Sequence, residues 1–219
     1  MISYAILVND ELKEIETLTK KILQFIKPDD EMVILQDIAE GEGLTADKLN
    51  VFRYLTKLAD SNKKQVTFHH HGLNNNFAKQ KNYLNSLCLQ PYIFNIDADE
   101  IPESYLITSV HDIISQYPNV DAFWVSRVNT VEGITQDDIT RWRWSVNEQG
   151  WINFPDPQLR IYKNTAAIKW KRPVHEYLTG YETYSHLPKE KEWSLIHNKQ
   201  IDKQRSQNEK YEKIMRKEL

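Results

Sequence analysis

Two carboxylates stand two positions apart directly after a short apolar run. Asp97 and Asp99 follow the apolar run over residues 92–96, with Ala98 between them. A run of this kind is typical of a strand that is buried on both faces. In an extended chain the two carboxylates point to the same side, so they repel each other unless a cation lies between them or their ligands. The pair predicts a divalent cation that also binds substrate phosphates, although an Asp-x-Asp can equally be a polar turn before a helix.

Acidic residues also follow two earlier apolar runs. Asp10 comes after the run over residues 2–8, and Asp37 comes after the run over residues 32–35. Helical periodicity separates these runs, and alternating strands and helices predict a parallel sheet with right-handed crossovers. Open α/β sheets bind ligands outside the carboxyl ends of their strands. We therefore expect Asp10, Asp37 and Asp97 to converge on one rim of the sheet.

The first half of the chain predicts regular elements throughout. Strands are expected over 2–8, 32–35, 65–68 and 92–96, and helices over 12–26, 44–58 and 74–89. His69, His70 and His71 follow the third strand. Successive residues of a strand face opposite sides, so three histidines in a row make no compact metal site. We interpret the triplet as a solvated turn.

The second half of the chain is aromatic and less regular. A helix is expected over 105–117, strands over 122–128 and 192–196, and short strands and loops over 141–184; a polar helix is expected from Lys199 onward. The alternation Arg141-Trp142-Arg143-Trp144 predicts that both arginines lie on one face and both tryptophans on the other. These residues, with Trp151, either shape a binding cleft or pack into the core.

Composition excludes several classes of protein. The chain has 219 residues, a net charge of −3 and a single cysteine, Cys88. The negative charge argues against nucleic acid as the main partner, and no stretch reaches the roughly 18 apolar residues of a transmembrane segment. A single cysteine cannot form an intramolecular disulfide, and the N-terminus has no basic leader, so a cytoplasmic protein is expected.

Four stretches together resemble the family 2 glycosyltransferases, which have the GT-A fold. The order and spacing of these stretches are more specific than any single motif. They are Ala5-Ile6-Leu7-Val8-Asn9-Asp10-Glu11; Phe77-Ala78-Lys79-Gln80-Lys81-Asn82 with the following 93–100; Phe154-Pro155-Asp156-Pro157-Gln158-Leu159-Arg160-Ile161-Tyr162; and Ile168-Lys169-Trp170-Lys171-Arg172-Pro173-Val174-His175-Glu176. The last two are similar to a bacterial subgroup that includes lipopolysaccharide-core transferases.

This resemblance implies an α/β GT-A fold: a mostly parallel central sheet flanked by helices, followed by an irregular aromatic-rich C-terminal part. It implies one domain over 1–219, with a nucleotide- and metal-binding half at 1–102, an acceptor-side half at 103–198 and a C-terminal polar helix at 199–219. The implied activity is metal-dependent, inverting transfer of a sugar, a hexose by expectation, from a nucleotide-diphosphate donor, a UDP-sugar by expectation, to a hydroxyl of a saccharide or other acceptor.

The resemblance also assigns roles to particular residues. Asp97 would contact the ribose or the metal-bound diphosphate, and Asp99 would bind the Mn²⁺ or Mg²⁺ ion directly. The metal neutralises charge that develops on a diphosphate leaving group. Residues 35–38, Leu-Gln-Asp-Ile, differ from the Asp-Asp-Gly-Ser-like turn of many members, so the nucleotide base is not fixed. The donor-binding residues expected from the resemblance are Asp10, Asp37, Gln80, Asn82 and Asp97.

An inverting reaction needs one general base and no protein nucleophile. Glu176 is the first candidate for this base and Asp156 is the second, and either must lie within hydrogen-bonding reach of the acceptor hydroxyl. The Glu-Asp pair that many relatives carry for this step is absent from the sequence. His175 or His197 would complete the metal shell, unless each is a histidine that is hydrogen-bonded inside the fold.

Two other functions compete with a sugar transferase. Haloacid-dehalogenase-like phosphatases also present an Asp-x-Asp after an apolar strand, but near the start of their core domain, whereas Asp97 follows three expected strands. A non-catalytic carbohydrate-binding protein would use the aromatic second half without metal-dependent donor binding.

Overall fold

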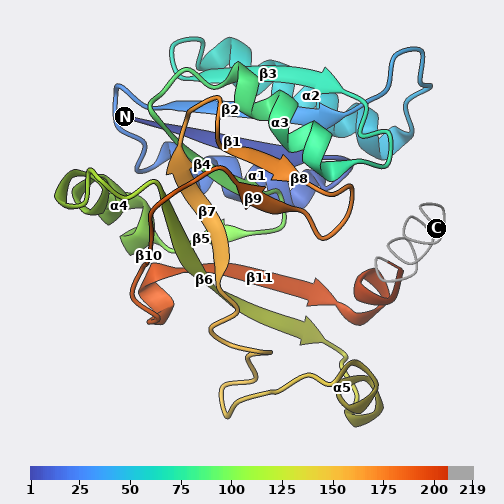
Figure 1. The fold of residues 1–219 in the computed structure, drawn as a ribbon. Coiled ribbons are helices and arrows are strands. Elements are labelled where there is room, and N and C mark those ends of the chain that lie inside the picture. The colour runs from blue at the N-terminus through green and yellow to red at the C-terminus, as the bar shows by residue number, and fades with distance from the viewer. Residues whose placement is uncertain (207–219) are drawn as a thin grey trace.

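The computed structural model describes residues 1–206 and shows strands and helices in a mixed α/β arrangement. A nine-stranded sheet runs through the molecule in the order β3-β2-β1-β4-β7-β6-β11-β5, with β10 paired to β6 (Figure 1). The expected mostly parallel, helix-flanked central sheet is confirmed. No helix in the described part of the chain is both long and apolar enough to cross a membrane.

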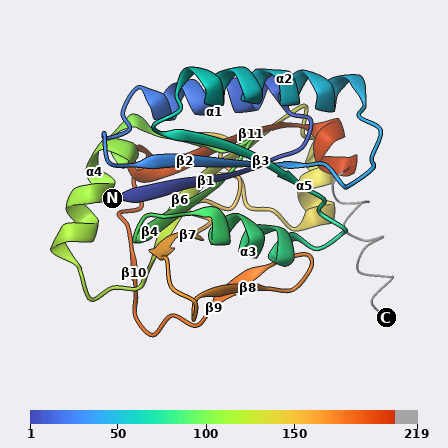
Figure 2. The same cartoon turned by 90° about the horizontal axis from the view of Figure 1, so that it is seen from above.

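The first half of the chain forms the parallel part of the sheet. Its strands are β1 (Ile2–Val8), β2 (Glu31–Asp37), β3 (Val66–His71) and β4 (Tyr92–Asp97). They alternate with α1 (Leu12–Leu23), α2 (Ala46–Ser61) and α3 (Phe77–Leu87). Seen from above, α1 and α2 cover one face of these strands and α3 covers the other (Figure 2). Strands β1, β2 and β4 are mostly apolar because helices bury both of their faces, whereas β3 at the edge of the sheet is more polar.

Alternating side chains along β1 show how both faces are filled. Ile2, Tyr4 and Ile6 pack into the core beneath α1 and α2, and Ala5 packs into the core beneath α3. Helix starts are fixed locally, because the side chains of Thr45 and Asn76 accept hydrogen bonds from the third backbone N–H of α2 and α3. Strand ends and helix starts are therefore held close to the rim where the sequence predicts a site.

The second half of the chain adds antiparallel pairing at the centre of the sheet. Its elements are β5 (Ile101–Pro102), α4 (Ser104–Gln116), β6 (Ala122–Glu132), α5 (Gln136–Trp142), β7 (Gln158–Lys163), β8 (Lys169–Lys171), β9 (Tyr177–Thr179), β10 (Tyr184–His186), a 3₁₀ turn (Lys191–Trp193) and β11 (Ser194–Gln200). Strand β7 lies between β4 and β6 and is antiparallel to both. The β8–β9 hairpin packs beside α3.

Two expectations about local structure are wrong, and the expected start of a third element, the C-terminal helix, is displaced. His69, His70 and His71 are the last residues of β3, paired in register with β2, and are not a turn. Residues 141–144 are not a strand: α5 ends at Trp142 and Arg143 adopts a left-handed conformation, which brings the Trp142 and Trp144 rings within 4.6 Å. Lys199 belongs to β11, and the helix begins at 201; the remainder of the expected C-terminal helix, 207–219, lies outside the described residues.

Candidate functional site

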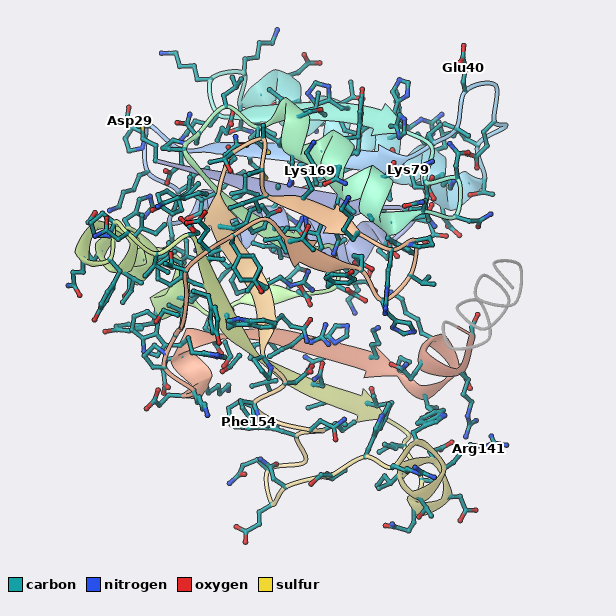
Figure 3. All side chains as sticks on the ribbon, in the orientation of Figure 1. Asp29, Glu40, Lys79, Arg141, Phe154 and Lys169 are labelled. Atoms are coloured by element: carbon teal, nitrogen blue, oxygen red, sulfur yellow. The ribbon has the colours of Figure 1, made fainter. Side chains whose placement is uncertain are left out.

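A cavity of about 1020 Å³ opens at the carboxyl ends of β1 and β4 and is lined by both halves of the chain. Parallel pairing places Leu7 opposite Asp97, so the ends of the two strands meet at this wall. The lining also includes Asp156 from the loop before β7, a loop that the labelled Phe154 marks in Figure 3. The lining includes these charged residues: Glu11, Asp37, Lys81, Asp97, Asp99, Glu100, Arg127, Asp156, Arg160, Glu176, Lys199 and Lys203.

Asp97 is held by two cations at the end of β4. One of its oxygens accepts a 2.8 Å hydrogen bond from Arg160, and the other lies 3.4 Å from the Lys81 ammonium. Burial alone would raise the pKa of Asp97, but Arg160 and Lys81 outweigh it and hold the pKa well below its usual range. Asp97 is therefore an ionised carboxylate whose charge is balanced by side chains.

Glu100 is one of the charged residues of the site that sequence reasoning missed. Its side chain is fully buried and accepts hydrogen bonds of 2.9 Å from Arg127 and 2.6 Å from Arg160. The only signal in the sequence was its place beside the two aspartates, and neither arginine was singled out. Because a buried carboxylate must be paired, Glu100 fixes both guanidinium groups beneath the cavity.

Asp99 faces a different set of partners on β11. Its Oδ2 atom lies 3.4 Å from His197 Nε2 and 3.7 Å from the Lys199 ammonium. Burial would raise the pKa of Asp99, but His197 and Lys199 lower it overall. Asp97 and Asp99 thus diverge toward different partners, Arg160 and Lys81 for the first and His197 and Lys199 for the second, although they are only two residues apart.

The donor atoms present fit a divalent cation at Asp99 and His197. A carboxylate oxygen and an imidazole nitrogen at this spacing can bind the same ion, and Mg²⁺ commonly takes its other ligands from water and substrate phosphates. Within residues 1–206 no group of three or more His, Cys, Asp or Glu side chains is placed to hold a metal ion. Any metal here would therefore depend on the ligand for much of its coordination.

The two candidate bases are held differently. Glu176 forms an ion pair with Lys81, whose ammonium nitrogen lies 2.7 Å from Glu176 Oε1. Asp156 has both oxygens engaged: Arg127 and Asn129 donate to Oδ2, and Gln158 donates to Oδ1 at 3.1 Å. Both carboxylates line the cavity.

One continuous chain of polar contacts joins all of these groups. It runs from Glu176 through Lys81, Asp97, Arg160, Glu100, Arg127, Asp156, Asn129 and His197 to Asp99. Side chains from α3, β4, β6, β7 and β11 contribute, so this series of polar contacts exists only when both halves of the molecule pack together. A disturbance at one carboxylate can therefore reach the next through hydrogen bonds.

Of the other residues expected to bind the nucleotide-sugar donor, some line the cavity and some do not. Asp37 and Gln80 line the cavity: Asp37 accepts a 2.7 Å hydrogen bond from the Leu73 backbone N–H, and Gln80 is hydrogen-bonded to His71. Asn82 makes two hydrogen bonds to the backbone of Trp170. Asp10 is exposed, and neither Asp10 nor Asn82 is among the lining residues.

Two residues of the cavity lining are unusual, one in its backbone conformation and one in its pKa. His175 lies on the cavity wall with a positive φ of 52°. Glu11, the neighbour of Asp10, also lines the cavity, and burial raises the pKa of its carboxyl group. Glu11 accepts a 2.8 Å hydrogen bond from the Asn9 backbone N–H, so it turns back toward the end of β1.

Aromatic side chains from the second half of the chain form part of the cavity wall. Trp124, Trp144, Tyr177 and Tyr181 all line the cavity. Trp142 and Trp151 are not among the lining residues; they contact Trp144 and Phe154 respectively. Flat apolar faces with polar edges suit sugar rings as well as protein cores.

Comparisons with known proteins bear on the fold. No protein-family model matches the chain, and no curated protein matches it. Among solved structures, S. aureus TarS 1–349 in complex with UDP is similar, with a TM-score of 0.59 and 11% identity over 90% of this chain and 60% of that chain. The same protein in complex with UDP-GlcNAc gives a TM-score of 0.54 at 11% identity, covering 90% and 58%.

A mannosyltransferase from Pyrobaculum calidifontis in complex with GDP-Man and Mn²⁺ has 15% identity over 74% of this chain and 44% of that chain. Its TM-score of 0.47 is too low to bear on this site. This chain thus spans about 60% of the length of the TarS 1–349 structures, and the likeness to them establishes a shared GT-A-type fold.

Proposed function

We propose that this protein is a glycosyltransferase that moves a sugar from a nucleoside-diphosphate donor to an acceptor hydroxyl. The observation that carries the proposal is the pair formed by Asp99 and His197 on the cavity wall, 3.4 Å apart, at the carboxyl end of the sheet. The GT-A-type fold supports it, and the TarS structures that share this fold contain UDP and UDP-GlcNAc. A UDP-sugar is therefore the first donor to test.

Asp99 and His197 would hold a divalent ion that neutralises the charge developing on the departing diphosphate. Lys199 and Lys203 line the same wall and add positive charge to it. Asp97 is bound by Arg160 and Lys81, so in this proposal it supports the donor pocket through those cations. The ion pairs of Asp97 also disfavour a phosphatase. In that reaction Asp97 would be the nucleophile, and it would have to leave both cations to attack phosphorus.

Transfer with inversion requires one base beside the acceptor. The acceptor oxygen attacks the anomeric carbon, the bond from that carbon to the diphosphate oxygen breaks, and the acceptor proton passes to a carboxylate. Glu176 is the first candidate because Lys81 holds it through one oxygen, whereas both oxygens of Asp156 already accept hydrogen bonds. The aromatic wall supports a saccharide as the acceptor.

Calorimetry with UDP in the presence of Mn²⁺ and in the presence of EDTA tests the proposal. We expect wild-type protein to bind UDP more tightly with Mn²⁺, and Asp99→Asn to lose that difference while it keeps the wild-type unfolding temperature. Asp29→Asn is the matched control, because Asp29 is exposed and lies away from the cavity (Figure 3). Equal UDP affinity of the wild type in Mn²⁺ and in EDTA would contradict the role of the metal. If the protein bound no nucleoside diphosphate, the proposed function itself would be refuted.

A further inference from the structure

Asn129 lies between the candidate metal ligand and a candidate base. It is on β6, directly opposite His197 on β11, so the two side chains share a face of the sheet. The two strands are neighbours in the sheet (Figure 1). Asn129 Oδ1 is 2.7 Å from His197 Nδ1, and Asn129 Nδ2 is 2.7 Å from Asp156 Oδ2. A single amide group therefore contacts both functional side chains.

The orientation of this amide follows from its partners. Asp156 Oδ2 also accepts hydrogen bonds from two nitrogens of Arg127, which can only donate, so Oδ2 is an acceptor. The same atom of Asn129 also lies 3.4 Å from the backbone carbonyl oxygen of Ile152, which is another acceptor. The edge that faces Asp156 must be the NH₂ group, and the carbonyl oxygen must face His197.

That orientation determines which nitrogen of His197 carries the proton. The Asn129 oxygen can only accept, so His197 Nδ1 must donate, and in the neutral imidazole Nε2 is then left with its lone pair. Nε2 is the atom that faces Asp99 Oδ2 at 3.4 Å. In this neutral ring Nε2 and Asp99 Oδ2 are two acceptors that face each other, and a cation can bind to both; in the charged imidazolium Nε2–H would instead donate to Asp99.

We propose that Asn129 is a positioning residue: anchored by Asp156, it fixes His197 in the Nδ1–H tautomer and so presents Nε2 to a cation shared with Asp99. The tautomer follows from the hydrogen bonds alone, and only its consequence for a donor-bound metal rests on the proposed function. Histidine ligands are commonly oriented in this way by a hydrogen bond at the other ring nitrogen. The base-side wall and the metal-side wall are thereby coupled through one amide.

Nuclear magnetic resonance of protein labelled with ¹⁵N-histidine tests the tautomer without metal or substrate. The spectrum is recorded in EDTA at a pH where the ring is neutral, and the signals of His197 are assigned by their loss in His197→Gln. We expect the proton on Nδ1 and an unprotonated Nε2 in the wild type. A proton on Nε2 of wild-type His197 would overturn the proposal.

Two substitutions separate positioning from general stability. Asn129→Leu removes the hydrogen bonds to His197, Asp156 and Ile152, so the Nδ1–H tautomer should give way to a mixture or to Nε2–H. Asn129→Asp retains an acceptor for Nδ1, so the tautomer should persist although the bond to Asp156 is lost. Asn198→Ala is the control: it removes the 2.6 Å hydrogen bond from Thr130, which joins the same two strands at the next pair, and it should leave His197 unchanged.

Metal affinity gives the second readout. Mn²⁺ binding in the presence of UDP should weaken by about 10- to 100-fold in Asn129→Leu, the usual effect of losing such a supporting hydrogen bond, and much less in Asn198→Ala. An unchanged tautomer in Asn129→Leu, or in Asn129→Asp a change to Nε2–H, would contradict the role given to Asn129. If the tautomer behaves as expected but no variant alters Mn²⁺ binding, the positioning stands and the metal role of His197 in the proposed function fails.

Discussion

Arg160 is the residue whose replacement should destabilise this protein most sharply among the charged groups of the site. Its side chain is 5% exposed and binds Asp97 at 2.8 Å and the fully buried Glu100 at 2.6 Å. Arg160→Met keeps much of the volume but removes the charge, so Glu100 is left with Arg127 and the Asp97 backbone N–H, and the Asp97 side chain is left with Lys81. A buried carboxylate that loses a charged partner cannot recover its hydration.

The size of the effect follows from this burial. Removing one partner of a buried ion pair costs about 3–5 kcal/mol of the free energy of unfolding. In a protein of about this length, each kcal/mol lowers the melting temperature by roughly 2–4 °C, so a decrease of roughly 6–20 °C is expected. Urea unfolding, followed by tryptophan fluorescence, measures the free energy directly if the slopes for wild type and variant agree.

Lys163→Met is the matched control, because Lys163 lies on the same strand and pairs with Asp121 at 3.0 Å. Both of those side chains are more than 20% exposed, so about 0–1 kcal/mol is expected. Adding Glu100→Gln to Arg160→Met should recover part of the loss, since the uncompensated charge is then removed. A loss below about 1 kcal/mol in Arg160→Met, or no recovery in the double variant, would refute the argument.

Two further predictions concern the base and the carboxyl group at the end of β1. Glu176→Gln should slow transfer by ~10²–10⁴-fold at saturating donor while donor affinity persists; near-normal turnover there, with collapse in Asp156→Asn, would identify Asp156 as the base. Burial raises the pKa of Glu11, so ionisation of this side chain lowers the free energy of unfolding. This loss of stability is absent at pH values below the ordinary carboxyl pKa and complete at pH values above the raised pKa. Glu11→Gln should therefore be more stable than wild type at neutral pH and equal to it in acid, as urea unfolding at both pH values would show; equal stability at neutral pH would contradict this.

The periodic elements of the first half could be predicted because their patterns are local. The strands before Asp37 and Asp97 are apolar runs, and the intervening helices repeat apolar residues at helical spacing. The second half was harder to predict. Strand β7 is only six residues long and contains Arg160, yet it occupies the centre of the sheet because β4 and β6 bury it on both edges. That pairing joins distant segments, and no local pattern encodes it.

The sequence by itself determined that carboxylates gather at the ends of parallel strands, because chain direction fixes which ends meet. It could not determine what each carboxylate binds. Asp97 and Asp99 have the same charge and lie two residues apart, but tertiary packing gives one to Arg160 and the other to His197. Ion pairs form between side chains brought together from different strands, and their strength depends on the burial that only the assembled sheet creates. The role of Asn129 likewise became visible only when β6 and β11 lay side by side.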